Sequence, residues 1–194
     1  MMRRSVASWS RLVMNRYRHH SRMLSTQVTV DPSTSLYDER FRTVVTGLNG
    51  SASPVKVHLT VTDGAKLTYG STTTYQPDGK CLDLDVEPAL DGPAAGMVDG
   101  MAPFWTMTPM PGSDNRFCST RVDSGLECSV NVECDGNIVA KTSFRRRAMA
   151  PGVRRVLVKE GGVRGTLFLP PDEEGACPGV IKKVHTIPGS LLCL

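Results

Sequence analysis

The stretch VKVHLTVTD, residues 55–63, alternates apolar and polar side chains from end to end. Its apolar positions are Val55, Val57, Leu59 and Val61, and the polar positions between them are Lys56, His58, Thr60 and Thr62. Because successive side chains of a β-strand point to opposite faces of its sheet, this period of two predicts a strand with one buried face.

Outward from this stretch, the chain repeats the same signal between turns. Residues 81–86 and 126–134 alternate in the same way, and Asp135-Gly136 ahead of residues 137–150 is a strong hairpin-turn signal. Hardly any segment has the 3.6-residue period of a helix. Many short strands separated by turns predict an all-β fold, an antiparallel β-sandwich.

Residues 86–117 break this rhythm, since they are rich in proline, glycine and methionine. We expect a long connection in which Trp105, Met107 and their neighbours plug an apolar face of the sandwich. The alternative is a ligand groove lined by methionine and aromatic side chains.

The first 26 residues contain six arginines, five serines and no acidic residue. Together with apolar residues that share one helical face, this composition is typical of a mitochondrial transit peptide and predicts a location in the mitochondrial matrix; a disordered basic tail is the alternative. Removing these six charges from the formal net charge of +4 leaves −2 for the rest of the chain. That charge excludes the phosphate-neutralising footprint of a nucleic-acid-binding protein. The sequence has no run of about 18 apolar residues, so it does not predict membrane insertion.

Six cysteines are present, at positions 81, 118, 128, 134, 177 and 193. They form no C-x-x-C pair, and the four histidines are not grouped with them. In the reducing matrix we therefore expect mostly free thiols, several of them buried, and we predict neither a metal site nor a cofactor.

The stretch PGVRRVLVKEGGVRGTLFLPP, residues 151–171, contains two runs of period two around Glu160-Gly161-Gly162. This pattern predicts a β-hairpin at residues 153–169. Pro170-Pro171 ends the second strand because proline has no backbone N–H to give to a strand ladder.

Together with DERFRTVVTGL, VKVHLTVTD, GMAPFWTMTP and a following PGVI, this stretch resembles the N-terminal part of the acyl-CoA thioesterases related to bile acid-CoA:amino acid N-acyltransferase. The resemblance implies an immunoglobulin-like β-sandwich followed by an α/β-hydrolase domain, whose sheet the hairpin opens. On this plan residues 1–26 are the transit peptide, residues 27–150 the sandwich and residues 151–194 the start of an incomplete hydrolase domain. From residue 182 the sequence departs from the family pattern.

The resemblance also implies an acyl-CoA substrate, hydrolysed to free fatty acid and CoA. In such relatives the nucleophile, acid and histidine come later in the chain than residue 194, so no catalytic residue carries over and we expect this chain alone to be inactive. Cys177 lies in a G-x-C-x-G match, but Pro178 has no N–H to contribute to an oxyanion hole. His185 falls in the divergent tail.

Two alternative functions remain open at this stage. The first is a non-catalytic interaction module, which associates with the full-length enzyme through the unpaired edges of the hairpin. In the second, the basic segments 144–148 and 152–155 contact the phosphates of CoA; the simpler interpretation is that they are solvated strand ends.

Overall fold

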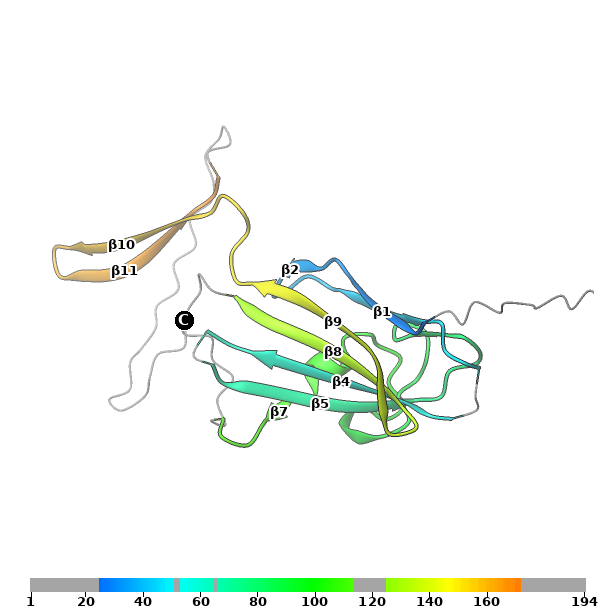
Figure 1. Cartoon of the computed structure of the whole chain (residues 1–194). Coiled ribbons are helices and arrows are strands. Elements are labelled where there is room, and N and C mark those ends of the chain that lie inside the picture. Colours follow the sequence, from blue (N-terminus) through cyan, green and yellow to red (C-terminus); the bar gives the residue numbers. More distant parts are fainter. Residues whose placement is uncertain (1–24, 51–52, 65, 114–124, 172–194) are drawn as a thin grey trace, which may run out of the picture.

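The computed structural model describes residues 25–50, 53–64, 66–113 and 125–171 (Figure 1). A three-stranded antiparallel sheet has the order β1–β3–β6, formed by β1 (Gln27–Asp31), β3 (Arg42–Thr46) and β6 (Cys81–Asp83). A six-stranded sheet has the order β2–β9–β8–β4–β5–β7, formed by β2 (Thr34–Leu36), β9 (Asn137–Arg147), β8 (Leu126–Cys134), β4 (Val55–Thr62), β5 (Thr68–Tyr75) and β7 (Thr108–Pro109). A separate hairpin pairs β10 (Arg154–Glu160) with β11 (Val163–Leu169).

The three-stranded and six-stranded sheets enclose one hydrophobic core. The smaller sheet contributes buried Val28, Val45 and Leu82. The larger sheet contributes alternate residues of its two central strands, namely Val55, Val57, Leu59, Val61, Cys128, Val130 and Val132. The fold is thus an all-β sandwich, as the alternation predicts.

Strand β4 is the best-supported element of this core. It pairs antiparallel with β5 on one side and β8 on the other along its whole length, residues 55–62. Its four apolar side chains are at most 3% exposed, while Lys56, His58, Thr60 and Thr62 lie on the outer face. The predicted half-buried strand is confirmed.

The turn between β8 and β9 also follows the prediction. Asp135 and Gly136 have φ angles of +50° and +78°. A tight two-residue hairpin turn needs positive φ at both central positions, and Asp followed by Gly tolerates this best. Beyond the turn, the far end of β9 pairs in parallel with β2, over residues 145–147.

The expected plug from residues 86–117 is corrected in one residue. Trp105 is 58% exposed, whereas Met101, Ala102 and Phe104 are buried and Met107 packs partly against the core. Ala102, Phe104 and Trp105 belong to a single helical turn, α1 (Ala102–Trp105), which follows a 3₁₀ turn, η1 (Gly92–Ala94). Since neighbouring residues of a helix point about 100° apart, directing Phe104 inward turns Trp105 outward, where its ring stacks edge-on against Phe104 at 5.4 Å.

The hairpin predicted at residues 153–169 is confirmed in position and register. Arg154 pairs with Leu169 at one end and Glu160 with Val163 at the other, around Gly161 and Gly162. Both glycines have positive φ, a conformation that costs little without a Cβ atom. Figure 1 shows the hairpin standing apart from the two packed sheets.

Candidate functional site

A gap in one edge of the six-stranded sheet adjoins a groove. Strand β5 pairs with β4 throughout, but on its other edge β7 pairs only with Tyr69 and Gly70. Farther along that edge, the backbone of Thr74 is hydrogen-bonded to Leu90 and Asp91, next to the bridge between Tyr75 and Ala89. No described strand covers residues 71–73 on this side.

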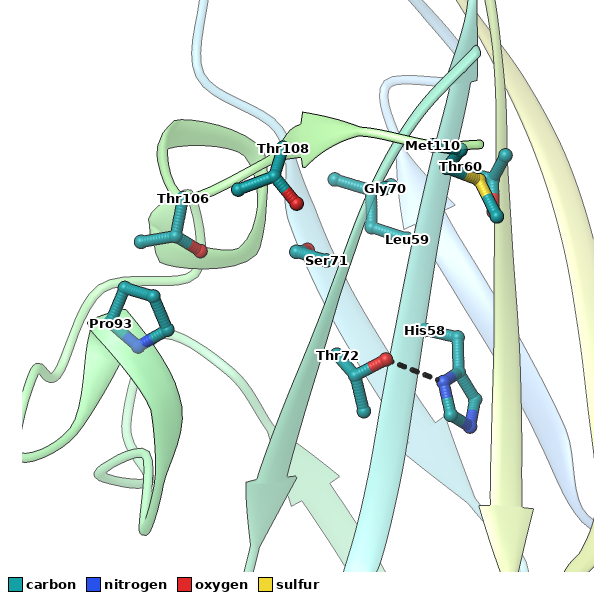
Figure 2. Close-up of a pocket in the computed structure, with 10 residues that line it drawn as sticks. All are labelled: His58, Leu59, Thr60, Gly70, Ser71, Thr72, Pro93, Thr106, Thr108 and Met110. Carbon is teal, nitrogen blue, oxygen red and sulfur yellow. Dashed lines mark hydrogen bonds between the residues drawn. The ribbon is translucent and has the colours of Figure 1, made fainter. Parts of the chain in front are cut away.

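The groove has a volume of about 350 Å³ and is lined by four parts of the chain (Figure 2). Strands β4 and β5 form its floor, η1 contributes Pro93, and the segment through β7 forms the remaining wall. Figure 2 shows Pro93, Thr106 and Thr108 along one side and His58 with Thr72 on the other. The described residues that line it are His58, Leu59, Thr60, Gly70, Ser71, Thr72, Pro93, Thr106, Thr108 and Met110.

His58, on β4, hydrogen-bonds to one residue on each neighbouring strand, β5 and β8. Its Nδ1 lies 2.9 Å from Thr72 Oγ1, and its Nε2 lies 3.0 Å from Glu133 Oε2. The hydrogen bond from His58, with a smaller effect of Lys56, lowers the pKa of Glu133. A carboxylate at this position accepts the Nε2 proton, so in neutral His58 the Nδ1 atom accepts the hydroxyl proton of Thr72.

The connectivity of Thr72, His58 and Glu133 is that of a hydroxyl, a base and an orienting carboxylate. Thr72, however, is exposed on the outer face of the sheet. Water therefore reaches the hydroxyl, and a site that excludes no water lacks the low dielectric that strengthens transition-state contacts. The arrangement is suited to holding a ligand by hydrogen bonds.

Two hydroxyls of the groove are available for such bonds. Ser71 donates to the carbonyl of Pro103 at 2.6 Å, and Thr106 donates to the carbonyl of Ala102 at 2.9 Å. The side-chain hydroxyls of Thr60 and Thr108 form no hydrogen bond with any described residue, although both backbones pair within the sheet. Both therefore offer a donor and an acceptor to a molecule in the groove.

Met110 provides an apolar side to the same groove. Its side chain lies over Gly70, where a Cβ atom would come within 3.2 Å of the Met110 sulfur. The absence of a side chain at Gly70 is what lets this methionine approach the strand. No Phe, Tyr or Trp is among the described lining residues, so the groove differs from the methionine and aromatic one considered for residues 86–117.

A second unusual feature is the buried arginine of β9. Arg146 is 0% exposed, and its guanidinium donates to Ser35 Oγ and to the carbonyls of Tyr37 and Glu39. The guanidinium carbon also lies 5.1 Å from the ring centres of both Phe41 and Phe104. Burial lowers the pKa of Arg146, but an arginine side chain keeps its proton at neutral pH.

Both interpretations of the basic segment 144–148 are wrong for Arg146, which neither contacts solvent nor faces a ligand. Its neighbour Arg145 is exposed and forms an ion pair with Glu127. Alternation along β9 explains the difference, because it sends every second side chain into the core. The buried cation holds the segment before β3 against the end of β9.

The hairpin β10–β11 exposes an amphipathic surface. The register places Val156, Val158, Val163, Leu167 and Leu169 on one face. The opposite face combines Leu157 and Phe168 with the cations Arg155, Lys159 and Arg164. Leu157 and Val163 are 63% and 62% exposed. A contiguous apolar face left in water marks a surface that binds something else.

Of the other residues considered from the sequence, some lie outside the described ranges and some are described as free thiols. Cys177, His185 and residues 1–24 lie outside the described residues. Cys81, Cys128 and Cys134 are free thiols, and burial raises the pKa of Cys128 to about 12. Within the described ranges no cluster of three potential metal ligands occurs, and no helix there has the length and apolar character to cross a membrane.

Comparison with known proteins identifies the family. Residues 38–160 match the family described as the acyl-CoA thioester hydrolase/BAAT N-terminal region. The chain belongs to this family. The matched segment covers the sandwich from just before β3 and ends with the last residue of β10.

Individual relatives agree with this assignment. The chain is 35% identical to mouse peroxisomal succinyl-coenzyme A thioesterase over 87% of its own length and 41% of the relative. It is 33% identical to human mitochondrial acyl-coenzyme A thioesterase 2 over 88% of its own length and 36% of the relative. The chain thus spans about two fifths of the length of these relatives.

Sequence reasoning missed the groove and its histidine. The alternation placed His58 on the outer face of its strand, but nothing in the sequence paired it with Thr72 and Glu133, which are 14 and 75 residues away. Knowledge of the strand register would have supplied both neighbours, since Thr72 lies directly across from His58 on β5 and Glu133 lies diagonally across on β8, opposite Lys56.

Proposed function

We propose that this chain supplies the β-sandwich of an acyl-CoA thioesterase, an enzyme that hydrolyses fatty-acyl-CoA to fatty acid and free CoA. The observation that carries this proposal is the family match over residues 38–160, which takes in all strands from β3 to β10. The relatives named above are thioesterases that act on coenzyme A esters.

In this proposal the sandwich is an accessory domain, and no described residue is catalytic. Residues 151–171 begin the sheet of an α/β-hydrolase domain, whose nucleophile, base and oxyanion donors perform the acyl transfer. The apolar face of the hairpin supports this role, because a strand pair that joins a larger sheet buries such a face.

A chimera tests the sandwich directly. The corresponding region of mouse peroxisomal succinyl-coenzyme A thioesterase is replaced by residues 27–150 of this chain, and thioester loss is followed by ultraviolet absorbance. We expect the chimera to keep at least about a tenth of the parent kcat/KM, because a domain of the same family preserves the supporting surface. A folded chimera without activity contradicts the proposal.

The chain alone is tested against saturated acyl-CoA esters of several lengths. We expect no thioester loss above buffer, because a covalent route without its nucleophile has no first step. Turnover that survives gel filtration and disappears in Cys177→Ser would assign catalysis to this chain. The same assay with Cys81→Ser serves as the control for an accessible thiol.

The location proposed for the protein is the mitochondrial matrix. The acid-free, arginine-rich residues 1–26 support it, and one relative is a mitochondrial enzyme whereas another is peroxisomal. A fluorescent fusion of residues 1–26 should enter mitochondria, and Arg11→Glu with Arg16→Glu should prevent this. Peroxisomal or diffuse fluorescence of the unchanged fusion contradicts the assignment.

The partner proposed for the hairpin is a full-length thioesterase of the same family, whose hydrolase sheet offers β10 and β11 a place to pair. Tagged chain should then co-purify with the full-length enzyme, and Val156→Lys with Leu167→Lys, a cross-strand pair on the apolar face, should abolish the association. Ile138→Lys is the matched control, since Ile138 is a 56% exposed residue of β9. Co-purification that the control weakens as much would rule out the hairpin as the contact.

A further inference from the structure

The groove beside β5 combines three kinds of recognition. Thr60 and Thr108 present unpaired hydroxyls, and Thr72 presents the lone pairs of a hydroxyl whose proton points to His58. The uncovered edge of β5 presents the backbone N–H and C=O of Thr72, since Thr68 and Thr74, four and two residues away on the same edge, already have partners. Met110 and Pro93 add small apolar surfaces.

The charges around the groove restrict what it holds. Among the described residues of the lining, His58 is the only titratable one, and its Nε2 faces Glu133. Lys56, on the same face of β4, lies 3.5 Å from Glu133 Oε1 and is paired with it. Because none of the described lining residues is a lysine or arginine, a phosphate would lose its hydration there without compensation.

A fitting ligand is therefore neutral and extended, with amide and hydroxyl groups and small apolar branches. An amide chain hydrogen-bonds to an uncovered strand edge in the manner of an added strand. Among the parts of an acyl-CoA ester, the pantetheine arm has two amides, one hydroxyl and a gem-dimethyl group. The adenosine phosphates do not share this chemistry.

We propose that the groove formed by β4, β5, η1 and β7 binds the pantetheine arm of coenzyme A, with Thr60 and Thr108 as its side-chain hydrogen-bond partners. The choice of coenzyme A as the ligand rests on the proposed function. The polar, uncharged lining of the groove is observed independently of that proposal. Pro93 and Met110 contact the gem-dimethyl group.

Binding is measured on the full chain by amide chemical shifts, with S-methyl pantetheine as the probe so that no thiol exchanges with Cys81. We expect shifts centred on residues 58–60, 71–72 and 108, and S-methyl-CoA should bind within about threefold of the same Kd. Adenosine 3′,5′-bisphosphate should produce no shifts there at ten times that concentration.

Threonine-to-valine variants inside and outside the groove give a matched comparison of ligand affinity. Thr60→Val with Thr108→Val should raise the Kd for S-methyl pantetheine about tenfold, because each lost hydrogen bond contributes modestly. Thr62→Val removes a hydroxyl from the same face of β4 outside the groove and should change the Kd less than twofold. Valine retains the shape and strand preference of threonine, and unchanged melting temperatures check the fold.

Several outcomes overturn the inference. They are absence of shifts with S-methyl pantetheine, equal loss in Thr62→Val, binding of the bisphosphate alone, and equally tight binding of an N-acetylated dipeptide amide, which would make the groove a peptide site. The proposed function has a separate readout. An active chimera without pantetheine binding removes only this inference, and pantetheine binding by an inactive chimera removes only the proposed function.

Discussion

Strand β4 and the hairpin β10–β11 have nearly the same sequence pattern and opposite surroundings. Both alternate apolar and polar residues, yet Leu59 in β4 is 3% exposed and Val163, on the apolar face of the hairpin, is 62% exposed. Strand β4 has a partner on each edge and a second sheet over its apolar face, whereas β10 pairs only with β11. Alternation therefore predicts a strand, but the rest of the fold decides whether its apolar face is buried.

The largest difference between the sandwich and the hairpin should come from arginine. Arg146→Ala should lower the free energy of unfolding by about 4 kcal/mol, because it removes the donor of three hydrogen bonds, one of them to buried Ser35, and opens a space between two rings. Arg164→Ala in the hairpin should cost less than about 0.5 kcal/mol. Urea unfolding measures both, and equal losses would contradict the structural assignment of Arg146.

A leucine pair tests the same contrast in apolar burial. Leu59→Ala should cost about 3 kcal/mol, from lost burial and the cavity left behind. Leu157→Ala should cost less than about 0.5 kcal/mol, because its side chain already contacts water in the chain alone. Thermal unfolding at matched concentration gives both values. A large loss in Leu157→Ala would show that the hairpin packs against another surface.

Hydrogen exchange sharpens the comparison without a mutation. Amides that pair β10 with β11 should exchange at least about a hundredfold faster than those pairing β4 with β8, because a two-stranded hairpin opens locally while the central strands exchange on global unfolding. Mass spectrometry of peptides from each region measures the rates. Protection of the hairpin that appears only when the full-length family enzyme is added would locate their contact.

The smallest of the expected effects on stability is the loss of one ion pair of the sandwich in acid. The hydrogen bond from Arg42 lowers the pKa of Asp83, so this ion pair stabilises the fold above the pKa of an unfolded aspartate, about 3.9, and is lost as the pH falls through the lowered value. Asp83→Asn should remove at most about 1 kcal/mol of stability at pH 6 and flatten the loss between pH 5 and 3.

The control for this effect is Asp78→Asn, which alters an exposed aspartate outside every ion pair that the structure describes. Urea midpoints at each pH measure the slope. Hairpin exchange rates should not respond to Asp83→Asn, since Arg42 and Asp83 lie on the three-stranded sheet. An unchanged slope in Asp83→Asn would exclude the pair as its source.

Much of the sandwich could be predicted because its signals are local. Period two located β4 and β8, and Asp135-Gly136 located the turn between β8 and β9. Trp105 was misplaced because a hydrophobicity pattern gives no direction within a single helical turn. Arg146 was misjudged because a charged residue in a basic run looks solvated until its alternation within β9 is counted.

The sequence by itself determined the strands, the hairpin at residues 153–169 and, through the resemblance it carries, the acyl-CoA thioesterase family. These features depend on residue alternation and turn preferences between near neighbours, which are readable along one chain. The tertiary structure alone decided the meeting of His58, Thr72 and Glu133, the groove beside β5 and the burial of Arg146. Each depends on strand register and sheet packing, which bring together residues from 14 to more than 100 positions apart.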